Sequence, residues 1–381
     1  MTCPKERPGV YDLDAYDYEL PASLIAQAPA VPRDSSRLLA WRVSSGVEHR
    51  VFRDIVDYLR PGDLLMLNDT RVLPARLHGT RVTDSGQKGR AEILLLDPVS
   101  SDFISWRALV RPGRRLKVGA GVEIGGRVLM ITGEEDDGVK IVRVGSDRED
   151  VFSFLDKHGT VPLPPYIKND SSTIRQDYQT VYAAQDGSVA APTAGLHFTE
   201  ELLQRVRELG VEIANVTLHV GLGTFRPVKS MDIRQHHIHS EYCQVSAEAE
   251  AAVRACRSRG GRVVAVGTTV VRTLESMAAE NGTIRSGVLD TELYIYPGFQ
   301  YKVIDALITN FHLPKSSLLM LVSALVCHLG SNQGCQDSQE KESPNMQKEE
   351  AALDYLMKIY SLAVSEKYRF FSFGDAMYIE K

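Results

Sequence analysis

The chain has 381 residues, of which 43% are hydrophobic and 24% are charged, a composition typical of a folded protein of two or three domains. Its 44 Lys and Arg against 49 Asp and Glu give a formal net charge of −5, which excludes a uniformly basic nucleic-acid-binding protein but not a local basic surface. The five cysteines lie far apart without CxxC spacing, which excludes a zinc ribbon and favours a reducing compartment.

No secretory or membrane-spanning segment is predicted. Residues 1–9 are charged and lack the apolar core of a signal peptide. The longest apolar run, 317–329, is shorter than the roughly 20 residues that cross a bilayer. We therefore expect a soluble, cytoplasmic protein.

The N-terminal part of the chain is predicted to contain a short helical pattern over 22–28, a strand over 37–43 and an amphipathic stretch over 51–59. Short β-rich runs separated by Gly and Pro turns then follow, as in a small barrel or sandwich. These runs cover 64–67, 75–77, 91–96, 106–110, 128–131 and 139–144. We predict an inserted β-barrel domain over 67–155.

The charge is distributed unevenly along the chain. Residues 67–130 hold eleven Lys or Arg and six Asp or Glu, a net charge of +5, whereas the rest of the chain holds 33 basic and 43 acidic residues, a net charge of −10. A basic domain within an acidic protein is typical of a contact surface for a polyanion. An ordinary solvated barrel face explains the excess equally well.

The remainder of the chain alternates between strands and helices. Thr199 is a suitable N-cap and Gly210 a suitable stop for one helix. Further strands are predicted over 214–220, 262–266, 306–310 and 369–379, and further helices over 247–256, 268–279, 318–329 and 349–366. This alternation predicts an α/β fold in which helices cover a sheet, built from residues 1–66 and 156–381. Residues 331–350 contain no Ile, Leu, Val or aromatic residue, which predicts a disordered insertion.

Ligands of open α/β sheets bind beyond the carboxyl ends of strands, and three loops lie at such positions. The first offers Gly221, Gly223, Thr224 and Phe225. A plain tight turn explains its glycines better when they are taken alone, and Arg226 breaks a GxGxxG pattern. The second and third loops carry hydroxyl, amide and imidazole groups, for which N-capping is the simpler alternative. These residues are Thr268, Thr269 and Arg272 in the second loop, and Asn310 and His312 in the third.

Two further polar clusters stand out. One holds Thr193, Gly195 and His197 just before the helix that Thr199 begins. The other, residues 236–241, packs three histidines and Glu241 into six positions. A metal site is one interpretation of the second cluster, but a polar segment lining a substrate fits better because no further ligand spacing accompanies it, so no metal is predicted. No GxSxG, HExxH or Walker A signature is present.

Seven sequence blocks resemble those of the S-adenosylmethionine:tRNA ribosyltransferase-isomerase family of queuosine biosynthesis. They include NDTRVLPARL at 68–77, AAPTAGLHF at 190–198, VTLHVGLGTF at 216–225 and VGTTVVR at 266–272. YIYPGFQYK at 294–302, TNFHLP at 309–314 and YRFFSFGDAM at 368–377 complete the set. The resemblance runs from about residue 18 to 379 and leaves 331–350 and 1–14 as additions.

The resemblance implies a reaction and a fold. The enzyme would transfer and isomerise the ribosyl part of S-adenosylmethionine onto 7-aminomethyl-7-deazaguanine at the wobble position of a tRNA with a GUN anticodon. The products would be epoxyqueuosine-tRNA, adenine and methionine. S-adenosylmethionine would be consumed as a substrate, so no resident cofactor is expected, and the enzyme would be a monomer with an inserted β-barrel.

The chemistry of this reaction suggests roles for the candidate residues. Acidified ribose 5′ protons favour a histidine base, for which His197, His219, His239 and His312 are eligible and the first two are preferred. Glu241 is a candidate acceptor for the proton of the attacking amine, Thr268, Thr269 and Arg272 for binding the methionine carboxylate, and Phe225 and Asn310 for holding the flipped-out base. The basic residues expected to contact tRNA are Arg71, Arg76, Arg111, Arg114, Arg115 and Lys117. The alternative function is a non-catalytic RNA-binding protein on the same scaffold.

Overall fold

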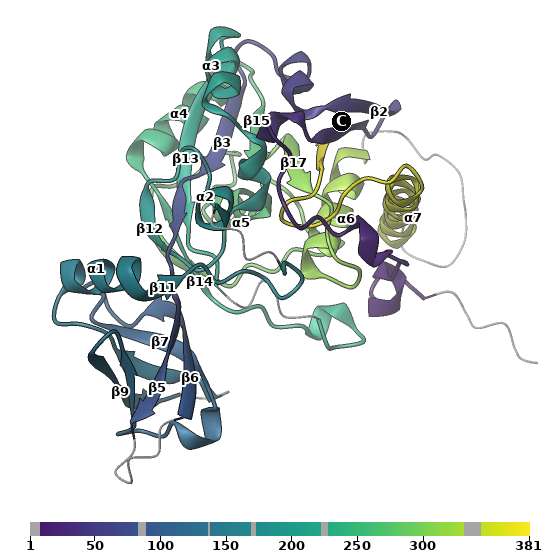
Figure 1. Ribbon diagram of the computed structural model, residues 1–381. Coiled ribbons are helices and arrows are strands. Elements are labelled where there is room, and N and C mark those ends of the chain that lie inside the picture. Colours follow the sequence, from purple (N-terminus) through teal and green to yellow (C-terminus); the bar gives the residue numbers. More distant parts are fainter. Residues whose placement is uncertain (1–7, 83–88, 136–137, 169–172, 222–227, 331–343) are drawn as a thin grey trace, which may run out of the picture. The chain divides into compact units, whose positions relative to one another are not determined.

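The computed structural model divides into two compact units (Figure 1). The first unit contains residues 1–69, 192–218 and 225–381, and the second contains 70–191 and 219–224. The structure describes residues 8–82, 89–135, 138–168, 173–221, 228–330 and 344–381. The second unit continues beyond the expected insert of 67–155, because strand β12 (Gln185–Ser188) pairs with β4 (Thr70–Val72) in parallel.

The first unit is built on a nine-stranded mixed sheet, which confirms the predicted α/β fold class. Its strand order is β16-β14-β13-β3-β15-β17-β18-β1-β2. The central neighbours β13, β3, β15 and β17 run parallel to one another. The strands are β1 (Arg37–Arg42), β2 (Gly46–Val51), β3 (Leu64–Asn68), β13 (Glu212–Leu218), β14 (Glu241–Val245), β15 (Val263–Val266), β16 (Gly287–Thr291), β17 (Ala306–Asn310) and β18 (Ala376–Glu380).

The central strands β3, β15 and β17 are buried along their whole length because both of their faces are covered, and polar residues occur only at the carboxyl ends of β3 and β17. Continuous apolar runs of this kind are typical of parallel strands with helices on both sides, whereas half-exposed strands alternate. The predicted strand at 306–310 is confirmed with the same bounds.

The helices of the first unit that begin at Glu200, Ala247 and Thr268 start where the sequence predicts. Thr199 caps α3 by accepting a hydrogen bond from the Leu202 N–H at 3.1 Å, and Gly210 after that helix has a φ of 86°. Helix α6 is buried along most of its length, as its uniformly apolar sequence predicts. The helices are α3 (Glu200–Glu208), α4 (Ala247–Ser258), α5 (Thr268–Ser276), α6 (Ser317–Gly330) and α7 (Pro344–Ser365).

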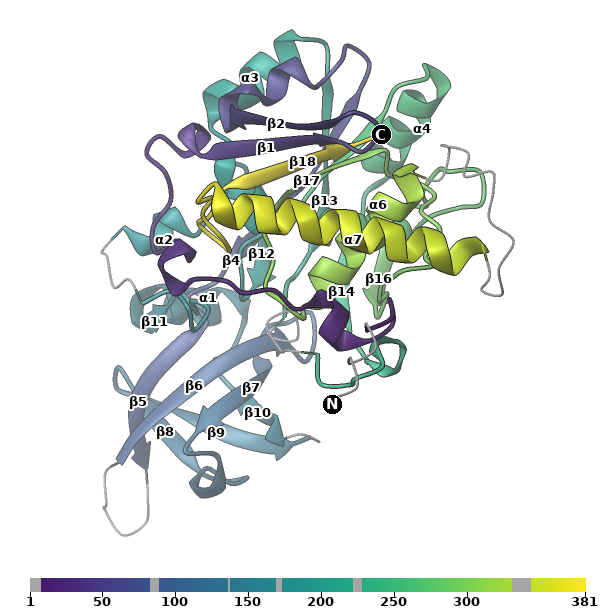
Figure 2. The ribbon, with the colours of Figure 1, turned by 90° about the vertical axis from the view of Figure 1, so that its right-hand side faces the viewer.

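Helix α7 begins within the expected insertion of 331–350, so the C-terminal limit of that insertion was predicted wrongly. Residues 344–348 were expected in a disordered insertion before a helix that starts at 349, but α7 already begins at Pro344, and Glu349 is buried. Its carboxylate accepts a hydrogen bond from the Tyr11 hydroxyl at 2.7 Å, which gives a polar residue a place in the interior. Figure 2 shows α7 lying along the sheet beside β17 and β18. The rest of the expected insertion, 331–343, lies outside the described residues.

Two segments near the N-terminus form short 3-10 helices, one within the predicted helical pattern over 22–28 and one within the amphipathic stretch over 51–59. The pattern over 22–28 gives only Ala22–Leu24, and the stretch over 51–59 gives Phe52–Asp57. Both are short, and Pro21 and Pro29 bracket the first of them, which limits how far a helix can extend. Phe52 and Ile55 bury the apolar side of the second.

The second unit contains a closed six-stranded antiparallel barrel, as predicted. Its order is β5-β6-β7-β10-β9-β8, and the pairing of β8 with β5 closes it. Gly79 lies at the closure, where an added Cβ would meet the Glu123 carbonyl oxygen at 2.5 Å, so only glycine allows this approach. The strands are β5 (Arg76–Val82), β6 (Gly89–Pro98), β7 (Ser105–Arg111), β8 (Gly121–Ile124), β9 (Arg127–Glu134) and β10 (Lys140–Arg143). β11 (Gly159–Thr160) adds to β5, and helices α1 (Arg148–His158) and α2 (Ile174–Asp177) follow β10 in this unit.

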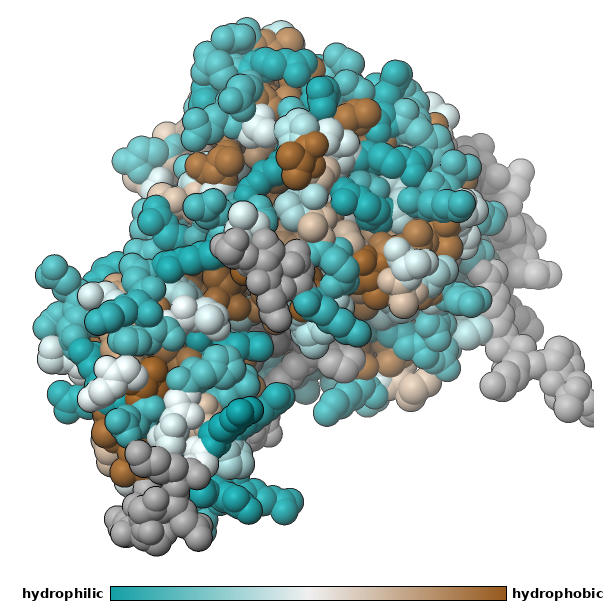
Figure 3. Space-filling view, viewed as in Figure 1, coloured by the Kyte–Doolittle hydropathy of each residue, from teal (hydrophilic) through white to brown (hydrophobic). Residues whose placement is uncertain are grey.

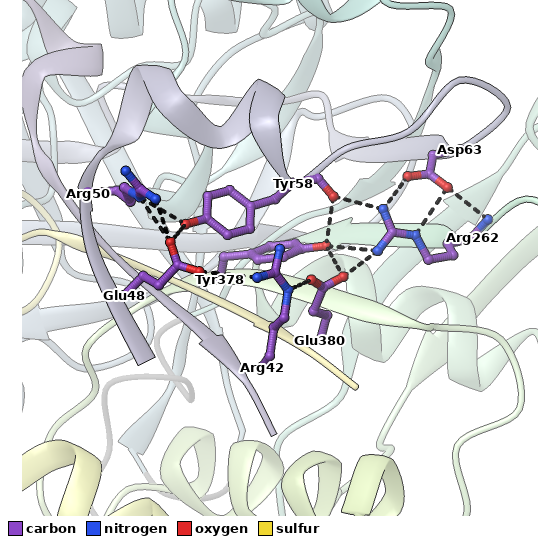
Figure 4. Close-up of polar contacts among 8 residues, drawn as sticks. All are labelled: Arg42, Glu48, Arg50, Tyr58, Asp63, Arg262, Tyr378 and Glu380. Atoms are coloured by element: carbon purple, nitrogen blue, oxygen red, sulfur yellow. Dashed lines mark hydrogen bonds and ion pairs between the residues drawn. The ribbon is translucent and has the colours of Figure 1, made fainter. Parts of the chain in front are cut away.

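A polar network fastens the amino ends of the central strands to the C-terminal strand (Figure 4). Arg262, just before β15, pairs with Asp63 before β3 at 2.5 Å and also with Glu380 at the end of β18. Glu380 accepts a second hydrogen bond, at 2.8 Å, from Arg42 of β1. The buried charges are therefore compensated, and the network holds four strands together at one edge of the sheet.

Hydrophilic residues cover most of the face drawn in Figure 3, with hydrophobic residues scattered between them. Within the described ranges, no helix has both the length and the apolar character needed to cross a bilayer.

Candidate functional site

The carboxyl ends of the central parallel strands bring the polar residues of the first unit to one edge of the sheet. Asn68 ends β3, Gly267 and Thr268 follow β15, and Asn310 ends β17. This edge lies opposite the Arg262 network, because the parallel strands begin at the network and end at this edge. Ligands of open α/β sheets bind at such edges.

Asn68 ties three elements of this edge together. Its side-chain oxygen accepts from the Leu218 N–H at 3.0 Å, and its amide nitrogen donates to the Leu218 carbonyl at 3.0 Å and to the Thr269 hydroxyl at 3.2 Å. The next residue, Asp69, accepts from the Thr217 hydroxyl at 2.7 Å. Both residues belong to the NDTRVLPARL block, and no role is predicted for either from sequence. The available signal is two polar residues at the end of a buried strand.

The first turn of α5 faces this edge without a side-chain cap. Gly267 precedes the helix with a φ of 91°, a conformation that favours glycine, and offers no capping side chain. Thr268 and Thr269 begin the helix and are both buried. A helix start of this kind attracts anions, because its first N–H groups have no partner within the helix.

His197 lies in the 3-10 helix Thr193–His197, which also contains Gly195. The Ser36 hydroxyl lies 2.8 Å from the His197 Nδ1 atom, and the ring stacks on Phe52. Burial lowers the pKa of His197 to about 3, and the Asn310 side chain partly opposes this shift. His197 is therefore neutral near pH 7. Thr193, by contrast, is half-buried.

His312 is held on both sides of its ring. The Thr309 hydroxyl lies 3.1 Å from Nε2, and the Tyr360 hydroxyl lies 3.4 Å from Nδ1. Burial lowers its pKa to about 3. Because both ring nitrogens have partners within the protein, the arrangement gives His312 a role in positioning the end of β17. Asn310 next to it donates to the Phe371 carbonyl at 2.9 Å.

These buried histidines make the stability of the protein depend on pH. A buried histidine with a lowered pKa gains a proton on unfolding at acidic pH, so stability falls as the pH falls below about 6.5. We expect His197 and His312 each to cost about 1.3 kcal/mol of unfolding free energy between about pH 7.5 and pH 5.5. Urea unfolding of wild type and His312→Gln at both pH values tests this. The deficit of the variant should shrink by about 1.3 kcal/mol at the lower pH, and a constant deficit would contradict the expectation.

Arg272 and Glu241 form a buried ion pair. Helix α5 carries Arg272, and β14 carries Glu241 at its first position. The guanidinium also donates to the Leu293 carbonyl at 3.0 Å and to the Thr291 carbonyl at 3.3 Å. Every nitrogen of this guanidinium therefore has a partner within the protein. The structure thus gives both residues a role in joining α5 to the edge of the sheet, which differs from the ligand-binding and proton-accepting roles expected from sequence.

The three histidines of the 236–241 cluster are exposed or half-buried. His239 is exposed, and the His236 ring lies edge-on to Tyr294 at 5.4 Å. Within the parts of the chain that the structure describes, no three His, Cys, Asp or Glu side chains are grouped so as to hold a metal ion. The alternative interpretation of this cluster as a metal site therefore gains no support from the described residues.

The second unit contains its own histidine site. The Thr70 hydroxyl lies 2.7 Å from the His219 Nδ1 atom. A Cβ on Gly187 would meet His219 Nε2 at 2.5 Å, so the ring requires glycine there. Burial lowers the pKa of His219 to about 4. Gly221 follows nearby in the chain, whereas the predicted site residues Gly223, Thr224 and Phe225 lie outside the described residues.

The basic residues of the barrel fall into two groups. Arg107, Arg127 and Lys140 are paired with acidic residues. Among the predicted tRNA-binding residues, Arg71 pairs with Asp186 at 3.7 Å and Arg76 with Glu92 at 3.9 Å. The other four are exposed and lie around the 3-10 helix Gly113–Arg115, and none has an acidic partner among the residues described. These four, termed here the basic turn, are Arg111, Arg114, Arg115 and Lys117.

Comparison with known protein families shows which family the chain belongs to. The model of a family described as queuosine biosynthesis protein matches residues 13–333 and 349–379. The chain belongs to the queuosine biosynthesis protein family. The predicted resemblance is thereby confirmed, and residues 334–348, which the family model leaves unmatched, lie within the expected insertion.

Individual members of the queuosine biosynthesis family align over nearly the whole chain. A protein of Symbiobacterium thermophilum is 49% identical, and one of Thermosipho africanus is 48% identical; each alignment covers 96% of this chain and 99% of the relative. Both carry the name S-adenosylmethionine:tRNA ribosyltransferase-isomerase. The crystal structure of S-adenosylmethionine tRNA ribosyltransferase from Thermotoga maritima is similar with a TM-score of 0.51 at 36% identity, covering 96% of this chain and 99% of that one.

Proposed function

We propose that this chain transfers and isomerises the ribosyl moiety of S-adenosylmethionine onto 7-aminomethyl-7-deazaguanine at the wobble position of a tRNA with a GUN anticodon. The products are epoxyqueuosine-tRNA, adenine and methionine. The observation that carries the proposal is the alignment at 46–49% identity with relatives of this name over nearly their full length. The polar sheet edge and the basic turn provide what such substrates need.

The donor fits the carboxyl edge of the sheet in the first unit. Its methionine carboxylate is an anion, for which the uncapped start of α5 at Thr268 and Thr269 is suited. Its ribose and adenine offer hydroxyls and ring nitrogens, for which Asn310, His197, Thr193 and Gly195 supply amide, imidazole, hydroxyl and backbone groups. S-adenosylmethionine is consumed as the ribosyl donor, and the reaction uses no resident cofactor.

The neutral imidazoles suit proton transfer at the reacting groups. The positive sulfonium acidifies the ribose 5′ protons, and a base must accept one of them. His197 and His219 are uncharged near pH 7, so each can accept a proton or a hydrogen bond. Their low pKa values make them weak bases when no ligand is bound, and a nearby negative charge in the complex would raise the pKa of either imidazole.

The tRNA fits the basic residues of the second unit. Arg71, Arg76 and the basic turn supply positive charge within a chain that is otherwise acidic. Phosphate contacts of this type position an RNA without determining its sequence. Recognition of the modified base then falls to the loops near the sheet edge. A monomer acting in the cytoplasm, where tRNA is present, completes the proposal.

Release of adenine is the direct test of this function. We expect the purified protein to release one adenine for each tRNA modified when it is given S-adenosylmethionine and tRNA bearing 7-aminomethyl-7-deazaguanine, measured by chromatography. The same tRNA with guanine at the wobble position is the control, because it lacks the attacking amine. Binding of the modified tRNA without adenine release would favour the non-catalytic alternative.

A further inference from the structure

One buried carboxylate at the sheet edge has no cationic partner among the residues that the structure describes. Asp69 follows the last residue of β3 and is only 8% exposed. The Thr217 hydroxyl donates to its Oδ1 atom at 2.7 Å, and burial raises the pKa of Asp69. An ionised carboxylate that is buried without a counter-charge destabilises a protein, so such groups are concentrated at functional sites.

The other buried carboxylates of the first unit either have compensating partners or lie away from this edge of the sheet. Asp63 and Glu380 pair with Arg262, Glu241 with Arg272, and Asp375 with Arg369. Glu275 accepts hydrogen bonds from three successive backbone N–H groups, those of residues 302–304. Glu349, which the Tyr11 hydroxyl holds, lies on α7 and not at the carboxyl ends of the parallel strands.

The neighbours of Asp69 indicate which cation it would bind. Asn68, directly before it, donates to the Thr269 hydroxyl in the first turn of α5, where an anion is favoured. Asp69 and the start of α5 follow the carboxyl ends of the neighbouring parallel strands β3 and β15. A carboxylate and an anion-binding helix start at the same edge of the sheet match a molecule that carries an ammonium and a carboxylate on one carbon. The methionine end of S-adenosylmethionine is such a group, and charge-assisted hydrogen bonds to it would be strong.

We propose that Asp69 binds the α-ammonium group of the methionine moiety of S-adenosylmethionine. This inference rests on the function proposed above and adds a binding residue to it. Thr217 is the positioning residue, because its hydroxyl fixes the orientation of the carboxylate.

Equilibrium binding of three ligands to Asp69→Asn tests the proposal. The asparagine keeps the shape and can still accept from Thr217, but it removes the negative charge. We expect affinity for S-adenosylmethionine and for S-adenosylhomocysteine to fall by the same factor, at least about tenfold, because both carry the ammonium. Affinity for 5′-methylthioadenosine, which has no amino-acid group, should stay unchanged. The thermal midpoint of the ligand-free variant should be no lower than that of wild type, because an uncompensated charge has been removed.

Control variants make the outcomes distinct. Asp57→Asn removes an exposed carboxylate of the same unit and should leave all three affinities unchanged. Thr217→Val keeps the Asp69 charge and should give a smaller loss with the same ligand selectivity. A loss confined to S-adenosylmethionine would assign Asp69 to the sulfonium, a loss for all three ligands would indicate a distorted site, and no loss would remove Asp69 from the site; each overturns the proposal. Failure of the wild type to bind S-adenosylmethionine would instead overturn the proposed function.

Discussion

Replacing Arg272 with alanine should destabilise the protein by about 3–5 kcal/mol, because it leaves the buried Glu241 carboxylate without its partner. The carbonyls of Thr291 and Leu293 would lose their donor as well. Denaturant unfolding measures the loss directly. The ion pair that joins α5 to β14 would be lost, so we expect the affinity for S-adenosylmethionine to fall as a secondary effect.

Removing the charge from both partners separates this role from direct ligand binding. In Arg272→Met/Glu241→Leu no buried charge is left unpaired, so we expect the double variant to recover a substantial part of the stability that Arg272→Ala loses. Recovery should remain incomplete, since the two carbonyls stay without a donor. Wild-type stability of Arg272→Ala, together with a raised KM for S-adenosylmethionine and an unchanged KM for tRNA, would contradict the structural role of the ion pair. It would instead support the role in binding the methionine carboxylate that was expected from sequence.

The contrast at Arg272 illustrates what sequence can predict about this fold. The predicted strand at 306–310 and the Thr199 cap were confirmed because buried apolar runs and caps are local signals. Strand β8 and the pair β4–β12 were not predicted. They are short and owe their conformation to partners distant in sequence, as the pairing of Thr70 with Gln185 shows.

The candidate site shows the same division between local and distant signals. The loops at the strand ends could be located, because an α/β alternation implies a carboxyl edge. The partners of individual side chains could not. His312 and Tyr360, or Arg272 and Glu241, meet only through the tertiary fold. Asp69 was overlooked for a related reason, since its distinguishing property is the lack of a cationic partner among the described residues, which a sequence does not display.

Reversing two charges in the basic turn should weaken tRNA binding strongly. Arg114 and Arg115 are exposed, and no described acidic residue pairs with them, so their charge is available to phosphates. Each phosphate contact releases counterions and makes the affinity depend on salt. For Arg114→Glu/Arg115→Glu we expect tRNA affinity at low salt to fall by roughly 10–100-fold and the slope of log K against log salt to decrease by about 2.

An equal charge reversal in the first unit, which is acidic overall, shows whether the location of the charges matters or only the net charge of the protein. Arg205→Glu/Arg207→Glu changes the same number of charges on exposed residues of α3. If the basic turn contacts the RNA, a salt series should give a flattened slope for the barrel variant and a near wild-type slope for the α3 variant. Affinity for S-adenosylmethionine should remain unchanged in both, because the donor site proposed above uses other residues. Equal slopes for all three proteins would mean that the charge of the basic turn is only a solvated surface, and the tRNA would then have to bind through other residues.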